Sequence, residues 1–311
     1  MIFCLGTTPA IQRVMVFQRV TLDVVNRAVE TLEGTAGKSV NVAKVLRAFG
    51  EEVFAASFFG GDRGEVIRAV LEGRGVRLGA IPVGPRTRLC TTLVDRSAGT
   101  HTELVEESQP VGAAAYERLG AIIEAEVPRA RAVVMSGSIT PGGPADLYRT
   151  TTELAGRHGV LSVVDAQGAP LTHALPASPG LVKPNRAELA ATTGRPLGDE
   201  AAVVAAMREL HERGAQRVLA TAGGAPTMAF DGRRVWRVTP PRLQVVNPIG
   251  SGDAFTAGLV WSLLRGDDLG EACRWGTAAG AANALTWLPG EVERGEVERL
   301  APEVRVEGVS N

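Results

Sequence analysis

The sequence predicts an α/β fold in which helices flank a central, mostly parallel β-sheet and a small second β-sheet forms a lid. Helical and strand patterns alternate from about residue 112 onward, which is typical of a parallel sheet covered by helices. Two earlier β-rich stretches, about 10–34 and 84–108, fit a separate small sheet. The 311 residues contain no internal repeat or low-complexity linker, so we expect one α/β unit over residues 1–311 with the lid as an excursion.

The first core strand and the lid are predicted from short apolar and alternating segments. Ile2 to Leu5 is typical of a buried strand, and Gly6 ends it. Alternation over residues 14–16 and a β-rich run over 89–94 predict lid strands. The turn residues of 95–99 then predict a hairpin.

The helix that follows the first lid strands has a clear apolar face. Val42, Val45, Leu46 and Phe49 are spaced at i, i+3, i+4 and i+7, and Gly50 stands where a C-terminal capping glycine belongs. We therefore expect this helix to bury one side.

The second half of the chain predicts the alternating core. The expected helices are 113–126, 145–158, 200–213, 254–264 and 269–285, and the expected strands are 132–135, 160–164, 181–183 and 217–220, with β-rich segments near Met228 and Val235. Ligands of open parallel sheets bind at the carboxyl ends of the strands, so the motifs described below should meet there.

Composition excludes several classes of function. A net charge of -1 gives no general attraction to nucleic acid or to an anionic membrane, and no apolar run has the length of a membrane span. Cys4, Cys90 and Cys273 are odd in number and widely spaced, which favours buried thiols over disulfides or a zinc site. We expect a cytoplasmic protein. The glutamates of residues 291–298, with their arginines, predict a solvated face.

The most informative segment is Asn-Pro-Ile-Gly-Ser-Gly-Asp at residues 247–253, directly before an apolar helix. Gly250 and Gly252 let the backbone turn its N–H groups toward an anion, and the helix N-terminus adds the positive end of its dipole. Such a loop, which also contains Ser251, would stabilise a phosphoryl group during transfer while Asp253 accepts a proton. The alternative is that Asp253 only caps the helix.

A second glycine turn, Gly34 to Asn41, delivers a cation and an amide to the start of a helix. It is not a Walker A loop, because only two residues separate Gly34 from Gly37. The Asn41 amide suits sugar hydroxyls and Lys38 suits an anionic substituent. An ordinary junction between loop and helix is the alternative.

The third segment is Lys183-Pro-Asn-Arg-Ala-Glu188. Asn185 and Glu188 are three residues apart at the start of a helix, as in a capping box. The same pair could serve magnesium and phosphate, because magnesium keeps several waters and needs only one or two carboxylates.

The fourth segment, Thr221-Ala-Gly223-Gly224, follows a predicted strand. It could hold a nucleotide phosphate or ribose. Taken alone, the pattern favours a tight hairpin turn.

In combination and order, these segments resemble the PfkB carbohydrate kinase family over essentially the whole chain. Gly37-Lys38 with Asn41 is similar to its N-terminal signature, residues 136–141 to its substrate loop, residues 183–188 to its Asn-x-x-Glu motif, and residues 247–253 to its C-terminal signature. Asn-Pro before Ile-Gly-Ser-Gly-Asp, with Thr8 to Ile11, is similar to the branch of tagatose-6-phosphate kinase and 1-phosphofructokinase.

The resemblance implies a ribokinase-like fold, ATP and Mg²⁺ as cofactors, Asp253 as base and an anion hole at Gly250 and Gly252. It also implies a homodimer through the lid. Carried over by position, it gives these roles: Gly37, Asn41 and Ser138 for the sugar; Arg27, Lys38 and Arg88 for a substrate phosphate; Lys183, Asn185 and Glu188 for phosphates and magnesium; Thr221, Gly223 and Gly224 for the nucleotide. Asn283, on the last Ala-rich helix, could line the adenine pocket or serve packing.

Three departures bear on the substrate. Gln12 stands where the family usually has an aspartate that grips substrate hydroxyls, Ser39 adds a side chain beside the sugar loop, and Asn247 replaces a leading aspartate. Gln12 therefore remains a candidate substrate-binding residue that lacks the usual charge.

We therefore expect an ATP-dependent kinase for a hexose phosphate such as tagatose 6-phosphate, fructose 1-phosphate or fructose 6-phosphate. A kinase for an uncharged sugar or nucleoside is the first alternative, although such a substrate gives Arg27, Lys38 and Arg88 no reason to converge. A non-catalytic binding protein for a sugar phosphate or nucleotide is the second. The presence of Asp253 next to both glycines argues against a binding protein, because binding alone needs no base.

Overall fold

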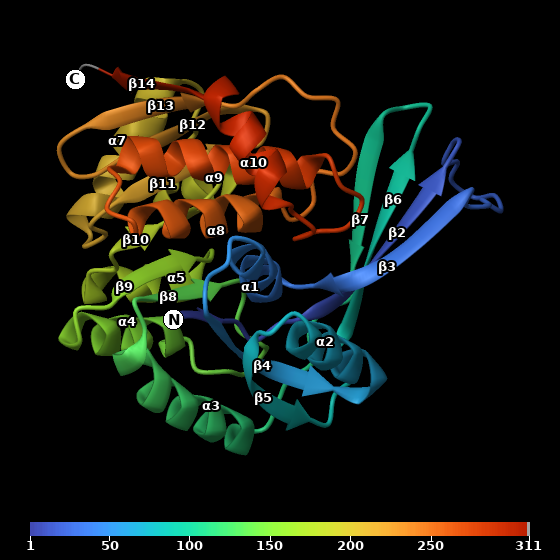
Figure 1. Cartoon of the computed structure of the whole chain (residues 1–311), viewed down its shortest axis with the longest axis horizontal. Coiled ribbons are helices and arrows are strands. Elements are labelled where there is room, and N and C mark those ends of the chain that lie inside the picture. Colours follow the sequence, from blue (N-terminus) through green and yellow to red (C-terminus); the bar gives the residue numbers. More distant parts are fainter. Residues whose placement is uncertain (310–311) are drawn as a thin grey trace.

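The structure, a computed structural model, describes residues 1–309 and contains two sheets. The larger sheet consists of β1 (Ile2–Leu5), β4 (Val53–Gly60), β5 (Arg77–Val83), β8 (Ala132–Ser136), β9 (Leu161–Asp165), β10 (Leu181–Val182), β11 (Val218–Ala222), β12 (Ala225–Phe230), β13 (Val235–Thr239) and β14 (Arg305–Val309). Its order is β14-β13-β12-β11-β10-β9-β8-β1-β4-β5 (Figure 1). The strands from β5 to β11 are parallel, and β12, β13 and β14 extend one edge in antiparallel pairing.

Helices cover both faces of this sheet because its strands are apolar on both sides. Along β1, Ile2 and Cys4 enter one buried cluster while Phe3 and Leu5 enter the other. The helices on the first face are α1 (Lys38–Ala48), α2 (Gly61–Gly73), α8 (Ser251–Leu263), α9 (Leu269–Ala284) and α10 (Arg294–Leu300). Those on the second are α3 (Ala113–Glu126), α4 (Leu147–Arg157), α5 (Ala169–Ala174), α6 (Arg186–Thr193) and α7 (Glu200–Glu212).

The lid is a four-stranded sheet that projects from one side of the α/β unit (Figure 1). Its strands are β2 (Ala10–Phe17), β3 (Glu30–Ala36), β6 (Arg88–Asp95) and β7 (Thr100–Val105), in the order β3-β2-β6-β7. Val14, Val16 and Val94 form its small apolar core, against which Trp287 and Leu288 pack from below. The segment after α9 thus packs against the base of the lid and supports it.

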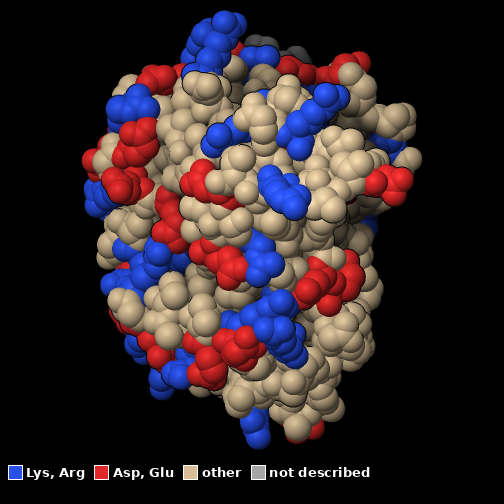
Figure 2. All heavy atoms as spheres, turned by 90° about the vertical axis from the view of Figure 1, so that its right-hand side faces the viewer, with Lys and Arg blue, Asp and Glu red and all other residues tan. Residues whose placement is uncertain are grey.

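The surface agrees with the charge expected from the sequence. On the lid side, basic and acidic side chains are interspersed without a broad region of one sign (Figure 2). Within residues 1–309, no helix combines the length and the apolar character that crossing a bilayer requires.

The predicted strands and helices are confirmed, including α1 with Gly50 at a φ of 86° after its end. The predicted α/β fold with a sheet lid is confirmed as well. Three consecutive elements, β4, α2 and β5, were not predicted. All eight residues of β4 are buried, so it appears in the sequence as a continuous apolar run without the alternation that marks a half-exposed strand.

Candidate active site

A buried carboxylate between two lysines organises the carboxyl ends of the central strands. Asp165 is the last residue of β9. Its Oδ1 accepts a hydrogen bond from Lys38 Nζ, and its Oδ2 lies 3.1 Å from Lys183 Nζ. Thr256 Oγ1, from α8, donates to Oδ2 at 2.9 Å. Only 1% of Asp165 is exposed. Its contacts hold the start of α1, the end of β10 and the first turns of α8 together.

Asp253 lies in the first turn of α8 beside this cluster. Asn41 Nδ2 donates to Asp253 Oδ2 at 2.7 Å, while Asn41 Oδ1 is buried and makes no hydrogen bond among the described residues. Burial raises the pKa of Asp253 to about 6, and the negative charge of Asp165 adds to the rise. The positive charges of Lys38 and Lys183 lower the pKa of Asp253 and so limit the rise. The carboxyl is therefore poised near neutral pH, as a general base requires.

The loop before α8 presents backbone donors to an anion. Gly250 has a φ of 85°, and a Cβ there would overlap Pro289, so only glycine fits. Within residues 1–309, the N–H groups of Gly250 and Gly252 make no hydrogen bond, whereas those of Ser251 and Asp253 bond within the turn. Two such donors at a helix N-terminus are suited to bind an anion.

Asn283 holds this loop in place from α9. Its side chain is fully buried and donates to the carbonyl of Ile249 at 2.8 Å and to Ser251 Oγ at 3.2 Å, while its Oδ1 accepts from Gly290 N at 2.7 Å. The amide is therefore used within the chain. A contact with adenine stays a prediction and would require these bonds to be exchanged.

Asn185 and Glu188 form the predicted capping box of α6. Asn185 Oδ1 accepts from Glu188 N at 2.9 Å and Glu188 Oε2 from Asn185 N at 2.8 Å. Glu188 Oε1 stays outside the cap, 3.9 Å from Lys38 Nζ. The described residues contain no cluster of three or more metal-ligating side chains. The carboxylate oxygen outside the cap could nevertheless serve magnesium, which takes most of its ligands from water and phosphates.

The segment from Thr221 to Gly224 is the predicted hairpin turn. Ala222 pairs with Ala225 across β11 and β12, and Gly223, with a φ of 59°, lies in the exposed two-residue turn between them. Thr221 N donates to the carbonyl of Pro184, which ties the turn to the start of α6. A contact with nucleotide stays a prediction.

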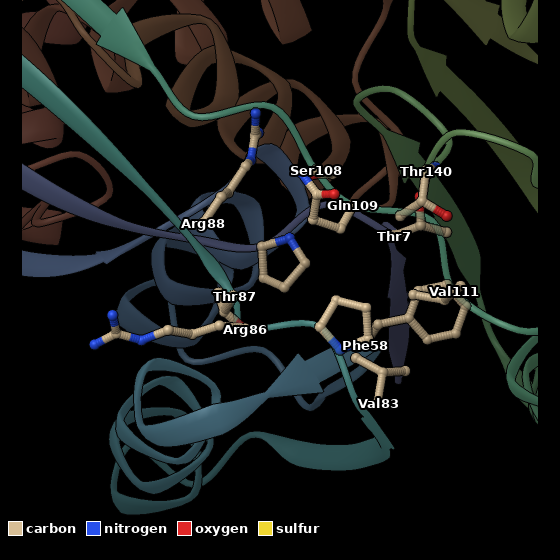
Figure 3. Close-up of a pocket in the computed structure, with 12 residues that line it drawn as sticks. Thr7, Phe58, Val83, Arg86, Thr87, Arg88, Ser108, Gln109, Val111 and Thr140 are labelled. Atoms are coloured by element: carbon tan, nitrogen blue, oxygen red, sulfur yellow. Dashed lines mark hydrogen bonds between the residues drawn. The ribbon is translucent and has the colours of Figure 1, made fainter.

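A pocket beside Arg88 lies at the carboxyl ends of β1, β4, β5 and β8 (Figure 3). Its polar lining includes Thr7, Thr140, Ser108 and Gln109, which lie on the side opposite the exposed Arg86. Arg88 Nη2 donates to the carbonyl of Thr8 at 3.2 Å, while its Nε is buried and makes no hydrogen bond within residues 1–309. This guanidinium is available to a ligand.

The remaining candidates for substrate binding lie in different surroundings. Ser138 is exposed at the end of β8, and its carbonyl accepts from Thr7 Oγ1 at 3.0 Å. Gln12 is buried in the lid, where its Nε2 donates to Thr92 Oγ1 at 2.8 Å. Its role toward a substrate stays a prediction.

The expected convergence of three cations does not occur within one chain. Arg27 is exposed on the loop between β2 and β3, at the outer end of the lid (Figure 1). That loop begins after Phe17, whereas Arg88 pairs with Ala10 at the opposite end of β2. At about 3.3 Å per residue, the two ends lie about 20 Å apart. Lys38 and Arg88 both border the loop around Thr8, and Arg27 does not.

Sequence reasoning missed Asp165, Lys44 and Glu291. Lys44 is a fully buried cation on α1 that pairs with Glu291, so Glu291 is not part of a solvated face as predicted. Glu296 and Glu298, both on α10, do form exposed pairs with Arg299 and Arg294. An acidic residue directly after the apolar run Leu-Ser-Val-Val was the available signal for Asp165, because strand ends face the ligand crevice.

Comparisons with known proteins point to one family. Residues 1–287 match the model of the pfkB family carbohydrate kinases. The chain is 26% identical over 309 residues to tagatose-6-phosphate kinase of Staphylococcus epidermidis, covering 98% of this chain and 99% of that protein. A solved structure of a provisionally named phosphofructokinase of Staphylococcus aureus has a TM-score of 0.81 at 27% identity, with 100% of both chains covered.

Phosphofructokinase-2 of Escherichia coli has the same fold. Its complex with fructose-6-phosphate has a TM-score of 0.85 at 24% identity and covers 97% of this chain and 98% of that one, and another of its solved forms is tetrameric.

The raised pKa of Asp253 predicts that its charge costs stability. A carboxyl whose pKa rises from 3.8 to about 6 on folding stabilises the fold below pH 3.8 and loses that contribution as the pH rises through 6. Asp253→Asn should therefore raise stability at pH 8, by about 1–3 kcal/mol, and flatten the pH dependence of unfolding. Denaturant unfolding from pH 4 to 8 measures this. Asp62→Asn, at an exposed carboxylate, is the control that should give no gain, and an Asp253→Asn variant less stable at pH 8 would contradict the assignment.

Proposed function

Since the chain belongs to the pfkB family of carbohydrate kinases, and is itself a carbohydrate kinase, we propose that it transfers the γ-phosphate of ATP to a hydroxyl of a hexose phosphate. The observation that supports this best is the pairing of Asp253, with its raised pKa, with the free N–H groups of Gly250 and Gly252. A base and an anion site next to each other suit phosphoryl transfer, in which charge develops on the transferred group.

In the proposed reaction, Asp253 takes the proton of the attacking sugar hydroxyl. The new bond forms between that hydroxyl oxygen and the γ-phosphorus, the bond from the γ-phosphorus to the bridging oxygen breaks, and ADP leaves. Asn41 donates to Asp253 and keeps its own Oδ1 free to accept from a sugar hydroxyl. At pH 7 to 8 the carboxyl is mainly ionised, so it can act as a base.

Two lysines are placed to balance the charge of the phosphates. Lys183 Nζ lies next to Gly252, 3.7 Å from where a Cβ would stand, and Lys38 borders the same crevice. Both ammonium groups are fixed by Asp165, so they need not reorganise when a phosphate arrives. Glu188 Oε1 is our candidate to orient the waters of a bound magnesium ion, which would supply positive charge to the phosphates.

Arg88 supports the choice of a phosphosugar. A buried guanidinium nitrogen without a partner is costly in a protein interior, and a phosphate in the adjoining pocket would satisfy it. The comparisons favour the same class, since the relatives named above include a tagatose-6-phosphate kinase and a phosphofructokinase solved with fructose-6-phosphate. We propose ketohexose phosphates as the substrate class.

We also propose that two copies associate through the lid. The loop between β2 and β3 exposes Leu22, Val24, Val25 and Val29, of which Leu22 is 89% exposed. Such apolar exposure is typical of an interface, and Arg27 lies in the same loop. Sedimentation velocity should give a dimer that Leu22→Ser weakens, whereas a wild-type monomer at micromolar concentration would contradict the interface.

Glu188→Gln separates the magnesium role from the cap. Glutamine completes a capping box as glutamate does, so thermal stability should stay close to wild type. The loss of charge should raise the Mg²⁺ concentration that gives the half-maximal rate. Glu188→Ala is the matched variant that loses both functions. An unchanged Mg²⁺ dependence in Glu188→Gln would leave this residue with the capping role alone.

The substrate class is tested by steady-state kinetics with MgATP. The panel is fructose 6-phosphate, fructose 1-phosphate, tagatose 6-phosphate and the same sugars without phosphate. Wild type should prefer the phosphorylated sugars, and Arg88→Ala should lower their kcat/KM by about 10- to 150-fold, equivalent to about 1.5–3 kcal/mol. The neutral sugars should be nearly unaffected. Preference for neutral sugars, or an equal loss on both sets, would refute the phosphosugar proposal.

A further inference from the structure

The chain uses lysine at only three positions. Of its 33 basic residues, thirty are arginines, and the lysines are Lys38, Lys44 and Lys183. Lys38 and Lys183 bind Asp165 at the candidate site, and Lys44 lies on the same helix as Lys38. Where a surface cation suffices, this sequence uses arginine. Lys44, which has no role in the mechanism above, therefore stands where a compact ammonium with three donors is needed.

The Lys44 ammonium joins three separate parts of the molecule. Its side chain is fully buried in α1, and Nζ donates to the carbonyl of Thr35 at 2.8 Å, to the carbonyl of Pro289 at 2.6 Å and to Glu291 Oε1 at 3.0 Å. An ammonium has three hydrogens for these three acceptors. A neutral amine has two, so deprotonation must break one of the three contacts, although Glu291 Oε1 would keep its hydrogen bond from Arg74.

The segment 286–291 transmits this contact to the reacting groups. Pro289 packs on Gly250, whose N–H belongs to the anion site. Gly290 approaches α1 so closely that a Cβ would lie 3.1 Å from Asn41 Cα. A shift of this segment would therefore move both the anion loop and the residue that orients Asp253.

The same segment also reaches the lid. Leu288 lies under Gly34 of β3, where a Cβ would come within 2.9 Å of its side chain, and it packs with Trp287 on the lid core. Thr35, the neighbour of Gly34, is the lid residue bound by Lys44. The ammonium thus fastens the base of the lid to the loop that supports the anion site.

We propose that Lys44 is a positioning residue for phosphoryl transfer, whose ammonium holds the base of the lid and the segment 286–291 in the arrangement that aligns Gly250 and Asn41. The role rests on the proposed function, since it concerns alignment for that reaction. The charged form is required, because only an ammonium can donate to all three oxygens at once.

The charges around Lys44 place its titration in an accessible range. Burial lowers the pKa of Lys44 to about 8, while the Glu291 carboxylate raises it, the guanidinium of Arg74 lowers it and the more distant Asp253 raises it. Arg74, after α2, is bound to Glu291 through both carboxylate oxygens. Removing Glu291 or Arg74 should therefore shift the Lys44 pKa in opposite directions.

The first measurement uses the ligand-free protein with ¹³C-labelled lysine. Three lysine signals are expected, and the one lost in Lys44→Arg identifies Lys44. Its midpoint should lie near pH 8 in wild type, fall in Glu291→Gln and rise in Arg74→Gln, by about 1 pH unit or less. Arg68→Gln, on the exposed side of α2, is the matched control that should leave it unchanged. A Lys44 midpoint that moves in neither variant would overturn the proposal, because its ammonium would then not contact Glu291.

The second measurement is the pH dependence of kcat with MgATP and the preferred sugar phosphate. The alkaline limb should move with the NMR midpoint, to lower pH in Glu291→Gln and to higher pH in Arg74→Gln, with KM values within about threefold. If Lys44 had only a structural role, the two variants would change stability without moving the alkaline limb. The same pH profile in wild type and both variants would therefore overturn the role of Lys44 and leave the proposed function intact. Absence of phosphorylation at every pH would contradict the proposed function itself, while the NMR titration would still report the ion pair.

Discussion

The ionic contacts of Asp165 are the constraint on which the site depends. A buried carboxylate is costly unless it is paired and hydrogen-bonded, and here each oxygen faces a lysine while Thr256 adds a hydrogen bond. Because Lys38 begins α1 and Lys183 follows β10, satisfying this single charge brings the proposed sugar loop and phosphate loop to the same strand end. The positions of both cations follow from it before any ligand binds.

Asp253 gains its chemistry from the same cluster. It is buried next to a second carboxylate, which raises its pKa, and next to the lysines of that carboxylate, which limit the rise to about 6. A group tuned in this way is ionised at neutral pH and still basic enough to take a proton. The cost is a buried charge, which the proposed role of Asp253 as a base would explain, since functional sites commonly give up stability for activity.

The sequence predicts most of the fold and the loops of the site, because glycine turns and helix starts are local features. The capping box of Asn185 and Glu188 and the turn at Gly223 are examples, since spacing alone determines them. The sequence did not reveal the roles of Asp165 and Lys44. Their partners are distant in sequence: the hydrogen bond from Thr256 to Asp165 spans 91 residues, and the contact between Lys44 and Glu291 spans 247. The expected cluster of Arg27, Lys38 and Arg88 does not form within one chain for a related reason, because the length of the lid strands separates Arg27 from Arg88.

The central claim is that Asp253 is the base in phosphoryl transfer, and single-turnover kinetics of Asp253→Asn test it most directly. With enzyme in excess over ATP and a saturating sugar phosphate, the rate of bisphosphate formation should fall about 10²–10⁴-fold, while the dissociation constant of MgATP stays within a few-fold of wild type. A base acts in the transition state, so this split between rate and binding is its signature. A rate within tenfold of wild type would contradict the claim and leave Asp253 as a residue of the first turn of α8 only.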